Sequence, residues 1–249
     1  ERVHRSGAAW LTPAQLDDLA ARRRRVGADI VRLVSLSGSG HPGGSLSTLD
    51  ALLMLYACAN LDPGAPHAAD RDRVVVSHGH ISPGVYGTLG SFGFIDIHDA
   101  YNGFRRAGST FGGHIETVVP GVEWNTGNLG QGLSAGCGFA LAARMHGAAH
   151  RTFVLMGDGE QQKGQVSEAR RFAAKFELSN LVALVDVNGL QIGGDTAKIM
   201  PVDLPAVWAA DGWNVLEVDG HDLAALYGAL RAAVTGATAR PERPTVLLL

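Results

Sequence analysis

Four short apolar runs in the second half of the chain constrain the fold more than any other feature of the sequence. They are Thr152–Met156, Leu181–Val185, Val215–Val218 and Thr245–Leu249. Helix-like stretches at 164–177, 203–211 and 222–234 lie between them. Uninterrupted apolar runs of this length are typical of parallel strands that are buried on both faces. The alternation therefore predicts an α/β fold with a doubly wound, mostly parallel sheet and helices on both faces.

The first half of the chain adds one strand and several helices to this prediction. Arg73–Ser77 has the pattern of a short buried strand, and the apolar residues from Leu16 to Val34 share one helical face that ends at Ser37–Gly40. Further helices are expected at 47–60 and 129–147, whereas 92–125 is rich in glycine and is expected to be irregular. Because no linker or repeat interrupts the chain, we expect a single domain over residues 1–249, with 1–36 as an N-terminal helical segment packed on it.

Charge, cysteine content and hydropathy exclude several classes of protein. The chain has 21 Lys and Arg against 24 Asp and Glu, so no basic field indicates a nucleic-acid partner. Its two cysteines, Cys58 and Cys137, lie among apolar and small residues, which favours buried thiols in a reducing compartment over a disulfide. The N-terminus lacks a signal-peptide pattern, and the longest apolar stretch is too short to cross a bilayer. We therefore expect a cytoplasmic protein without a membrane partner.

Polar side chains follow two of the predicted strands. One apolar run continues into Gly157-Asp158-Gly159, and the next leads to Asn188. Because a strand–helix–strand unit returns the chain to the same sheet edge, where ligands bind in such folds, Asp158 and Asn188 are expected to converge. Their oxygens, with a backbone carbonyl, suit Mg²⁺ or Ca²⁺ beside a diphosphate. Alternatively, Gly-Asp-Gly is only a strand-to-helix turn in which the carboxylate caps the next helix.

A glycine-rich segment, Thr126–Gly132, opens the expected helix at 129–147. Backbone N–H groups at a helix start attract anions, so the segment is a candidate phosphate contact. It is not a dinucleotide fingerprint, because the glycine order is wrong and no convincing strand precedes it. Glycine also permits close packing, and Gly130, Gly132, Gly136 and Gly138 are expected to let another helix approach. We expect both properties to hold, with packing on one side and phosphate contact at the tip.

Three of the ten histidines stand out by their glycine-rich neighbours. His41, His80 and His114 each lie in a stretch that is typical of a loop, where the backbone can come close to a ligand. Imidazole exchanges protons near neutral pH and hydrogen-bonds sugar hydroxyls, so the three are candidate catalytic residues. Surface or helix-capping roles are the alternative for each of them. His78, His98 and His221 are expected to be structural.

The order of these motifs resembles the transketolase family over about 40–249. The matching segments are Gly40–Gly43, Ser77–His80, Gly113–Glu116, Thr126–Gly132, Gly157–Gly159 and Asn188–Leu190. Each segment is common, but the combination in this order is specific. The length is similar to that of the separate N-terminal subunit of a split transketolase. The resemblance implies a thiamine-diphosphate-binding fold and the transfer of a two-carbon unit from a ketose to an aldose.

The resemblance also implies roles for residues of this chain. Asp158, Asn188 and the Leu190 carbonyl would hold the divalent metal, Mg²⁺ or Ca²⁺. Contacts with thiamine diphosphate would come from Gly127, Leu129, Gly157, Asp158, Gly159, Asn188, Leu190 and Ile192, with Leu129 and Ile192 against the rings. His41, His80 and His114 would bind donor hydroxyls and assist proton transfer. The carboxylate that activates the cofactor's aminopyrimidine belongs to the other half of the fold. The implied partner is therefore a C-terminal, pyrimidine-binding transketolase subunit, in a heterotetramer with two of each chain.

The sequence departs from the family pattern at three places. Asn128 stands where the family usually has Pro, and we expect this only to loosen a turn. Lys163 stands where the family usually has Glu in an acidic network that includes Glu168, so the lysine is expected to pair with Glu168 or with a carboxylate of the partner. The sequence ends at Leu249, before a family segment that carries a further active-site histidine.

Several other functions stay open. The chain could belong to another thiamine-diphosphate enzyme, such as a deoxyxylulose-phosphate synthase or a component that decarboxylates 2-oxo acids, although the histidine set favours transketolase. Lys163 could instead mark a subunit that binds the cofactor without catalysis. A nucleotide-dependent oxidoreductase is disfavoured, because the dinucleotide fingerprint is missing. The donor and acceptor sugars, and whether they are phosphorylated, are not determined by the sequence.

Overall fold

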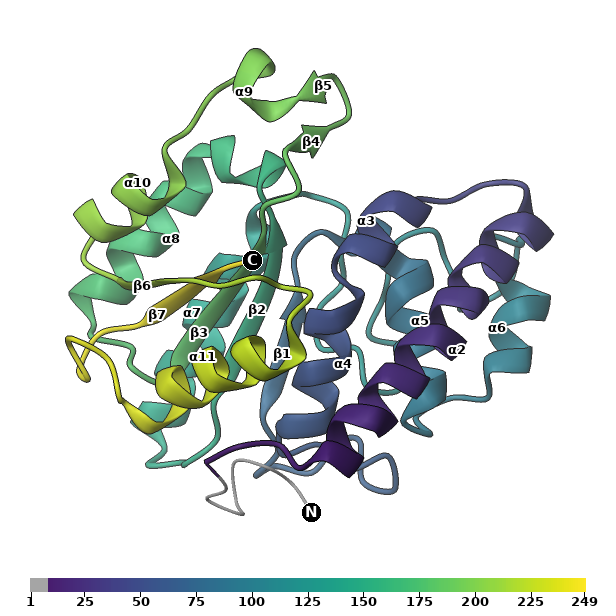
Figure 1. Ribbon diagram of the computed structural model, residues 1–249, viewed down its shortest axis with the longest axis horizontal. Helices are drawn as coiled ribbons and strands as arrows, with labels where there is room; N and C mark the ends of the chain where they lie inside the picture. The colour runs from purple at the N-terminus through teal and green to yellow at the C-terminus, as the bar shows by residue number, and fades with distance from the viewer. Residues whose placement is uncertain (1–8) are drawn as a thin grey trace. The chain divides into compact units, whose positions relative to one another are not determined.

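The computed structural model describes residues 9–249, and these residues form two compact units (Figure 1). We call them the helical unit and the sheet unit. The helical unit comprises the chain up to Arg71 together with Gly79–Gly127, and the sheet unit comprises Asp72–His78 and Asn128–Leu249. None of the helices within residues 9–249 is long and apolar enough to cross a membrane. The first eight residues of the expected N-terminal segment lie outside the described part of the chain.

A five-stranded, all-parallel sheet organises the sheet unit. Its strands are β1 (Arg73–Val76), β2 (Thr152–Gly157), β3 (Leu181–Asp186), β6 (Asn214–Glu217) and β7 (Thr245–Leu248). The strand order is β1-β2-β3-β7-β6, so β7 returns between β3 and β6. Strands β2 and β3 are almost completely buried, as their uninterrupted apolar runs predict. The predicted parallel α/β sheet is thereby confirmed.

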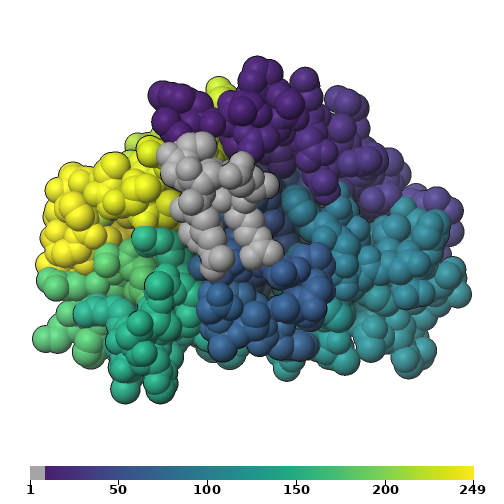
Figure 2. All heavy atoms as spheres, turned by 90° about the horizontal axis from the view of Figure 1, so that it is seen from below, coloured from purple at the N-terminus to yellow at the C-terminus, as the bar shows by residue number. Residues whose placement is uncertain are grey.

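Helices cover both faces of this sheet. Figure 1 shows α11 (Leu223–Thr235) in front of the sheet and α7 (Gln131–Met145) and α8 (Gly164–Lys175) behind it. A further helix, α10 (Leu204–Ala210), packs near β6, and the rings of Trp208 and Trp213 pack edge to face in the core there. Figure 2 shows the C-terminal part of the chain, in yellow, at the surface. Apolar helix faces therefore bury the sheet on each side.

The glycines of α7 bring that helix close to the sheet rather than to another helix. A Cβ at Gly132 would lie 2.4 Å from the Cβ of Ser77, and one at Gly136 would lie 2.3 Å from a methyl of Val154. Gly130 faces the start of α8, whereas Gly138 faces open space. The expectation that these glycines serve helix–helix packing was thus mostly wrong. The physical reason is that a helix behind a parallel sheet meets its side chains at every turn.

The helical unit consists of helices that are joined by loops and short turns. Its elements are α2 (Pro13–Ser37), α3 (Pro42–Ser47), α4 (Leu49–Cys58), the 3₁₀ turn η1 (Gly79–Ile81), α5 (Ser82–Ser91) and α6 (Ile97–Gly103). A capping box at Thr12 starts α2. Gly38 in the left-handed conformation ends the helix, within the stretch Ser37–Gly40 where the sequence predicts its end. The stretch expected to be irregular contains α6, because Asp96 caps a helix start there. Both cysteines are buried thiols outside any disulfide.

Three short elements complete the sheet unit at the carboxyl end of β3. Strands β4 (Leu190–Gln191) and β5 (Gly194–Asp195) form a small antiparallel hairpin, and α9 (Thr196–Ile199) follows it. The 3₁₀ turn η2 (Gly159–Gln162) follows β2 directly. The alternating pattern of the sequence does not predict these elements, because each is only two to four residues long and spans about one period of a helix or strand signal.

Candidate functional site

Asp158 joins the turns that follow two neighbouring strands. The register of β2 and β3 pairs Gly157 with Asp186, and the Asp158 amide donates to the Asp186 carbonyl at 3.0 Å. The Asp158 carboxylate accepts from the Gly159 amide at 2.7 Å and from the Gly189 amide at 2.8 Å. The side chain is buried, 7% exposed. A single carboxylate therefore fixes the turn after β2 against the turn after β3.

Asn188 is oriented by its own neighbours in the second turn. Its Nδ2 donates to the Asp186 carboxylate at 3.0 Å, and its Oδ1 accepts from the Leu190 amide at 2.9 Å. Because Gly189 bonds to Asp158, the residue that follows Asn188 is in direct contact with the aspartate. The alternative interpretation of Asp158 as a cap is also correct, since Asp158 is the N-cap of η2. Capping of η2 and contact with the turn that carries Asn188 thus coexist.

The oxygen atoms at this edge suit a hard divalent cation. Within residues 9–249, no group of three or more His, Cys, Asp or Glu side chains is arranged to hold a metal ion, so a ligand set must include neutral oxygens. The Asp158 carboxylate and the Asn188 amide supply one charged and one neutral oxygen, and each oxygen keeps lone-pair capacity beyond its described hydrogen bond. Burial raises the pKa of Asp158, and a bound cation would oppose that shift. The donor set therefore fits Mg²⁺ or Ca²⁺.

A cavity of about 620 Å³ lies at the carboxyl ends of the strands in the sheet unit. Asp158, Val187, Glu217 and Leu248 line it from the ends of β2, β3, β6 and β7. Most of its wall is apolar, with the carboxylates of Asp158, Asp203 and Glu217 at its edge. Its volume is that of a site for a small molecule, and its place in the fold is where parallel sheets bind ligands.

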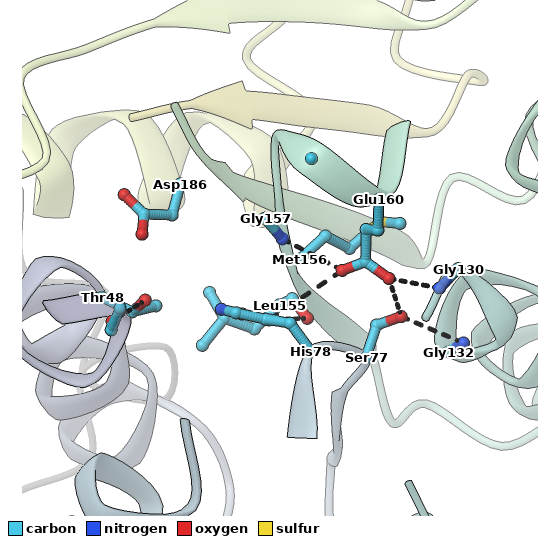
Figure 3. A network of polar contacts seen from close by, with 12 residues as sticks. Thr48, Ser77, His78, Gly130, Gly132, Leu155, Met156, Gly157, Glu160 and Asp186 are labelled. Atoms are coloured by element: carbon cyan, nitrogen blue, oxygen red, sulfur yellow. Dashed lines mark hydrogen bonds and ion pairs between the residues drawn. The ribbon is translucent and has the colours of Figure 1, made fainter. Parts of the chain in front are cut away.

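The amide groups at the start of α7 are already occupied by the chain itself (Figure 3). The Gly130 amide donates to the Glu160 carboxylate in a short hydrogen bond, and the Gly132 amide donates to the Ser77 hydroxyl at 3.2 Å. The Gly157 amide also donates to Glu160, at 3.0 Å. The expected anion site at this helix start is therefore filled by an internal carboxylate. Any phosphate contact from Gly157 must use a group other than this N–H.

Glu160 is the functional candidate that sequence reasoning missed. Its carboxylate is almost completely buried and also accepts from the Ser77 hydroxyl at 2.5 Å (Figure 3). Burial raises the pKa of Glu160 to about 7, although the hydrogen bonds from Ser77, Gly157 and Gly130 oppose the shift. The carboxylate ties together the end of β1, the turn after β2 and the start of α7. The only sequence signal was an acid directly after Gly157–Gly159, and nothing in its neighbours indicated burial.

The residues expected to contact the cofactor rings differ in exposure. Leu190 and Ile192 lie in and beside the β4–β5 hairpin, and both side chains are exposed, Leu190 by 66%. Leu129 is half-buried before the start of α7. These two exposed side chains give the hairpin an apolar surface that an apolar ligand or partner can contact. Gly127 belongs to the helical unit, and its backbone φ of 142° with open space at the Cβ position requires glycine.

The helical unit brings the three candidate histidines together. His41 precedes α3, His80 lies in η1, and the rings of His41 and His80 pack edge to face at 5.1 Å. Burial lowers the pKa of His80 to about 4, with smaller effects of His41 and His114. Burial also lowers the pKa of His114, and the charge of Arg105 adds to this. The clustered imidazoles are therefore neutral at physiological pH, when they can accept as well as donate hydrogen bonds.

Close packing of the backbone fixes this arrangement. Thr126 packs directly on Gly79, where a Cβ would lie 1.9 Å from the threonine hydroxyl. The same hydroxyl donates to the Ile115 carbonyl at 2.8 Å, next to His114. Thr126 thus connects the turn that carries His80 to the loop that carries His114. The glycine-rich neighbours of the histidines reflect this packing as well as access to a ligand.

The histidines expected to be structural have structural surroundings. His78 is buried in the sheet unit, where its Nδ1 contacts the Leu155 carbonyl at 3.2 Å and lies 4.0 Å from Glu160. The ring of His98 packs edge to face on Tyr101. The backbone amide of His221 donates to the Asp219 carboxylate at 2.9 Å.

Lys163 is exposed at the N-cap of α8, and Glu168 is exposed on that helix. In the part of the chain that the structure describes, Lys163 makes no ion pair, so the expected pairing with Glu168 is not observed. Its side chain lies beside Gly130, and its charge lowers the pKa of the nearby Glu160 slightly. The charge of Lys163 therefore affects the pKa of Glu160 without an ion pair between the two side chains.

Comparisons with known proteins agree with this geometry. Residues 17–249 match the family of the transketolase, thiamine diphosphate binding domain. The chain is 41% identical over 213 residues to an apulose-4-phosphate transketolase component of Phocaeicola vulgatus, which is named as one subunit of that enzyme, covering 84% of this chain and 75% of that protein. It is 36% identical over 230 residues to a 6-deoxy-6-sulfo-D-fructose transketolase subunit of a Clostridium species, covering 89% of this chain and 82% of that protein.

Solved structures give the same result. The transketolase of Campylobacter jejuni superposes with a TM-score of 0.83 at 30% identity, covering 96% of this chain and 38% of that chain. A transketolase of Pichia stipitis in complex with sedoheptulose 7-phosphate superposes with a TM-score of 0.86 at 31% identity, covering 93% of this chain and 36% of that chain. This chain thus spans little more than a third of these longer enzymes. With the strand-end aspartate and the histidine cluster in place, it belongs to the transketolase family and has the fold of that family's thiamine diphosphate binding domain.

Proposed function

We propose that this protein is the N-terminal, diphosphate-binding subunit of a two-subunit transketolase that depends on thiamine diphosphate and a divalent metal. In this proposal the whole described chain forms one functional half, and a C-terminal, pyrimidine-binding subunit supplies the other half in a heterotetramer with two of each chain. The observation that carries the proposal is the Asp158 carboxylate held between the turns after β2 and β3, where it accepts from the amide of the residue that follows Asn188. That edge offers the oxygen ligands that Mg²⁺ or Ca²⁺ takes next to phosphate.

The roles proposed for the following residues are those that the resemblance to the family implies, and all of these residues except Gly127 lie in the sheet unit. Asp158, Asn188 and the Leu190 carbonyl hold the metal, and Gly157 and Gly159 border the diphosphate. Gly127 contributes a further backbone contact, and Leu129 and Ile192 pack on the cofactor rings. Bound thiamine diphosphate supplies the nucleophile and the electron sink for cleaving and forming the bond next to a ketone. The chain contributes position and exclusion of water.

The histidines of the helical unit act on the substrate in this proposal. A neutral imidazole can bind a sugar hydroxyl and accept its proton, and the low pKa values of His41, His80 and His114 support this role. Two relatives are named for acidic sugars, one a phosphate ester and one a sulfonate. We therefore infer that the donor ketose of this enzyme also carries an acidic group at the end remote from the reacting carbonyl.

Reconstitution tests the proposal directly. The purified chain is titrated with thiamine diphosphate in the presence and absence of Mg²⁺, first alone and then with a C-terminal transketolase subunit of the same organism. We expect tight, Mg²⁺-dependent binding in the complex and ketol transfer with a panel of phosphorylated, sulfonated and neutral ketoses. Absence of transfer from every donor, with the cofactor bound, would identify a non-catalytic protein and overturn the proposal.

The Lys163→Glu variant tests whether Lys163 marks a subunit that has lost activity or an enzyme that is adapted to the lysine. Lys163 replaces the acid that the family usually has, and it lies near the buried Glu160. If the lysine marks lost activity, restoring the acid raises the rate of ketol transfer strongly. A fall in the rate identifies an enzyme adapted to the lysine, which is the result that the proposal expects.

A further inference from the structure

Arg105 has an unusual backbone for its residue type. It follows the end of α6 and has a positive φ of 55°, which it shares among described non-glycine residues only with Glu177. Its amide donates to the Phe111 carbonyl at 2.8 Å, which closes the loop between them. A long side chain in this conformation persists only where its surroundings hold it. Strained backbone of this kind often occurs at functional sites, and the contacts of the Arg105 side chain indicate its role here.

The guanidinium of Arg105 bridges two loops of the helical unit. Its Nη1 donates to the Ser39 hydroxyl at 2.8 Å, and Ser39 lies two residues before His41. Its plane also lies against Gly113, where a Cβ would come within 2.7 Å of Nε and 2.8 Å of Cζ. Gly113 directly precedes His114. One side chain therefore contacts the loop of His41 and the loop of His114, and the absence of a side chain at Gly113 makes room for it.

The charge of Arg105 acts on the same imidazoles. Arg105 and His114 lie in electrostatic reach of His41, and His41 and His114 lie in electrostatic reach of His80. Arg105 also acts on His114. Among the described hydrogen bonds of its side chain, the partner is a neutral hydroxyl rather than a carboxylate. This hydrogen bond therefore leaves the positive charge beside the histidines unneutralised.

We propose that Arg105 is a positioning residue of the transketolase site: its guanidinium, seated on Gly113 and bonded to Ser39, holds the loops of His41 and His114 in register and keeps one positive charge beside both imidazoles. The inference rests on the proposed function of the histidines. Planar contact and charge are separable properties of arginine, since lysine keeps the charge but cannot reproduce the planar fork. The planar contact and the charge of Arg105 together keep the imidazoles of His41 and His114 neutral and at fixed positions.

The test compares four variants of the reconstituted complex. Arg105→Gln removes charge and contact, Arg105→Lys keeps the charge alone, and Gly113→Ala displaces the guanidinium while keeping Arg105 in the chain. Arg106→Gln is the matched control, because Arg106 is the neighbouring arginine and is exposed as Arg105 is. The readouts are thermal unfolding, kcat and KM against pH, and the imidazole pKa values of His41 and His114 measured by NMR titration of the isolated full chain.

Arg105→Gln is expected to raise the pKa of both imidazoles, to move the acidic limb of the kcat profile to higher pH, and to lower kcat about tenfold to a hundredfold with a smaller change in KM. Arg105→Lys restores the imidazole pKa values but leaves kcat low, and Gly113→Ala lowers kcat in the same way. Arg106→Gln changes none of these, and the pKa of His98 serves as internal reference. The NMR readout needs no activity, so it separates this inference from the proposed function.

Two results would overturn the inference. Unchanged imidazole pKa values in a folded Arg105→Gln chain would show that the charge does not reach the histidines. Full recovery of kcat in Arg105→Lys would show that the bridge between the loops has no role. If Arg105→Gln does not fold, Gly113→Ala still tests the bridge, because only the far end of a flexible side chain must move to admit its methyl group.

Discussion

The sheet unit and the helical unit carry candidate sites of opposite construction. At the sheet edge, Asp158 and Asn188 hold their positions through hydrogen bonds to the backbone of the turns that bear them. In the helical unit, His41, His80 and His114 come from separate loops and are arranged by packing on glycine and by one arginine. The first site is anionic and holds a cation in the proposed function, whereas the second is a cluster of neutral imidazoles next to a positive charge.

Substitutions at the two sites should therefore impair different steps. Loss of a strand-end oxygen removes a ligand from a rigid frame, so binding of the metal and cofactor should suffer while the fold persists. Loss of a histidine leaves the frame for the cofactor intact, so turnover should suffer while cofactor binding persists. Variants of the two units should therefore separate into a binding class and a turnover class. The following predictions test that division.

Asp158→Asn should have the largest effect. The amide keeps the size of the side chain, but it loses the anionic oxygen and places an NH₂ group near the Gly159 or Gly189 amide. We expect the affinity for thiamine diphosphate and Mg²⁺ to fall at least about 100-fold, as the loss of a metal ligand or its support does elsewhere. Calorimetric titration of the reconstituted complex measures this, with the exposed Asp17→Asn as control. If Asp158→Asn bound thiamine diphosphate and Mg²⁺ with wild-type affinity, the metal would no longer be part of the proposed function.

His114→Ala tests the opposite class. His114 is exposed, so its removal should leave the fold unchanged. We expect kcat for ketol transfer to fall about 100-fold, the lower range for loss of a general acid or base, with unchanged cofactor affinity. His221→Ala is the control, because it changes the same residue type outside the cluster. A fall in cofactor affinity equal to the fall in kcat would break the division between the two classes.

How far the sequence predicts the structure follows the same division. The sheet edge was predictable because strand period and the return of a strand–helix–strand unit fix where Asp158 and Asn188 must lie. The histidines were found by their glycine-rich neighbours, but their mutual contact was not, because loop geometry has no period. Glu160 and Arg105 were missed for a shared reason. Each is a charged residue whose importance comes from burial or from a bridge between distant segments, and neither property is visible in adjacent residues.

Glu160→Gln should fall between the two classes, because Glu160 supports the sheet edge without belonging to it. Its carboxylate accepts from Ser77, Gly130 and Gly157, and an amide would turn a donor toward one of these donors. We expect the free energy of unfolding to fall by about 1–3 kcal/mol, the cost of an unsatisfied buried polar group. Urea unfolding measures this. Glu168→Gln removes the same charge at an exposed position and should change stability little; an equal loss there would exclude the buried network as the cause.

The smallest expected effect is the acid sensitivity that His80 gives the helical unit. Its pKa in the folded chain is about 4, against an ordinary value of 6.5, because burial and the neighbouring His41 and His114 disfavour its charge. Between these values the unfolded chain binds a proton that the folded chain does not, so stability present above pH 6.5 is lost as the pH falls toward 4. After allowance for solvent screening of a partly exposed group, we expect this loss to be about 1 kcal/mol. Unfolding of wild type and His80→Gln at pH 7.5 and pH 5 measures it: the difference between the two pH values should be smaller in the variant, and an equal difference would mean that His80 is charged in the folded chain and that the helical unit does not hold its imidazoles neutral.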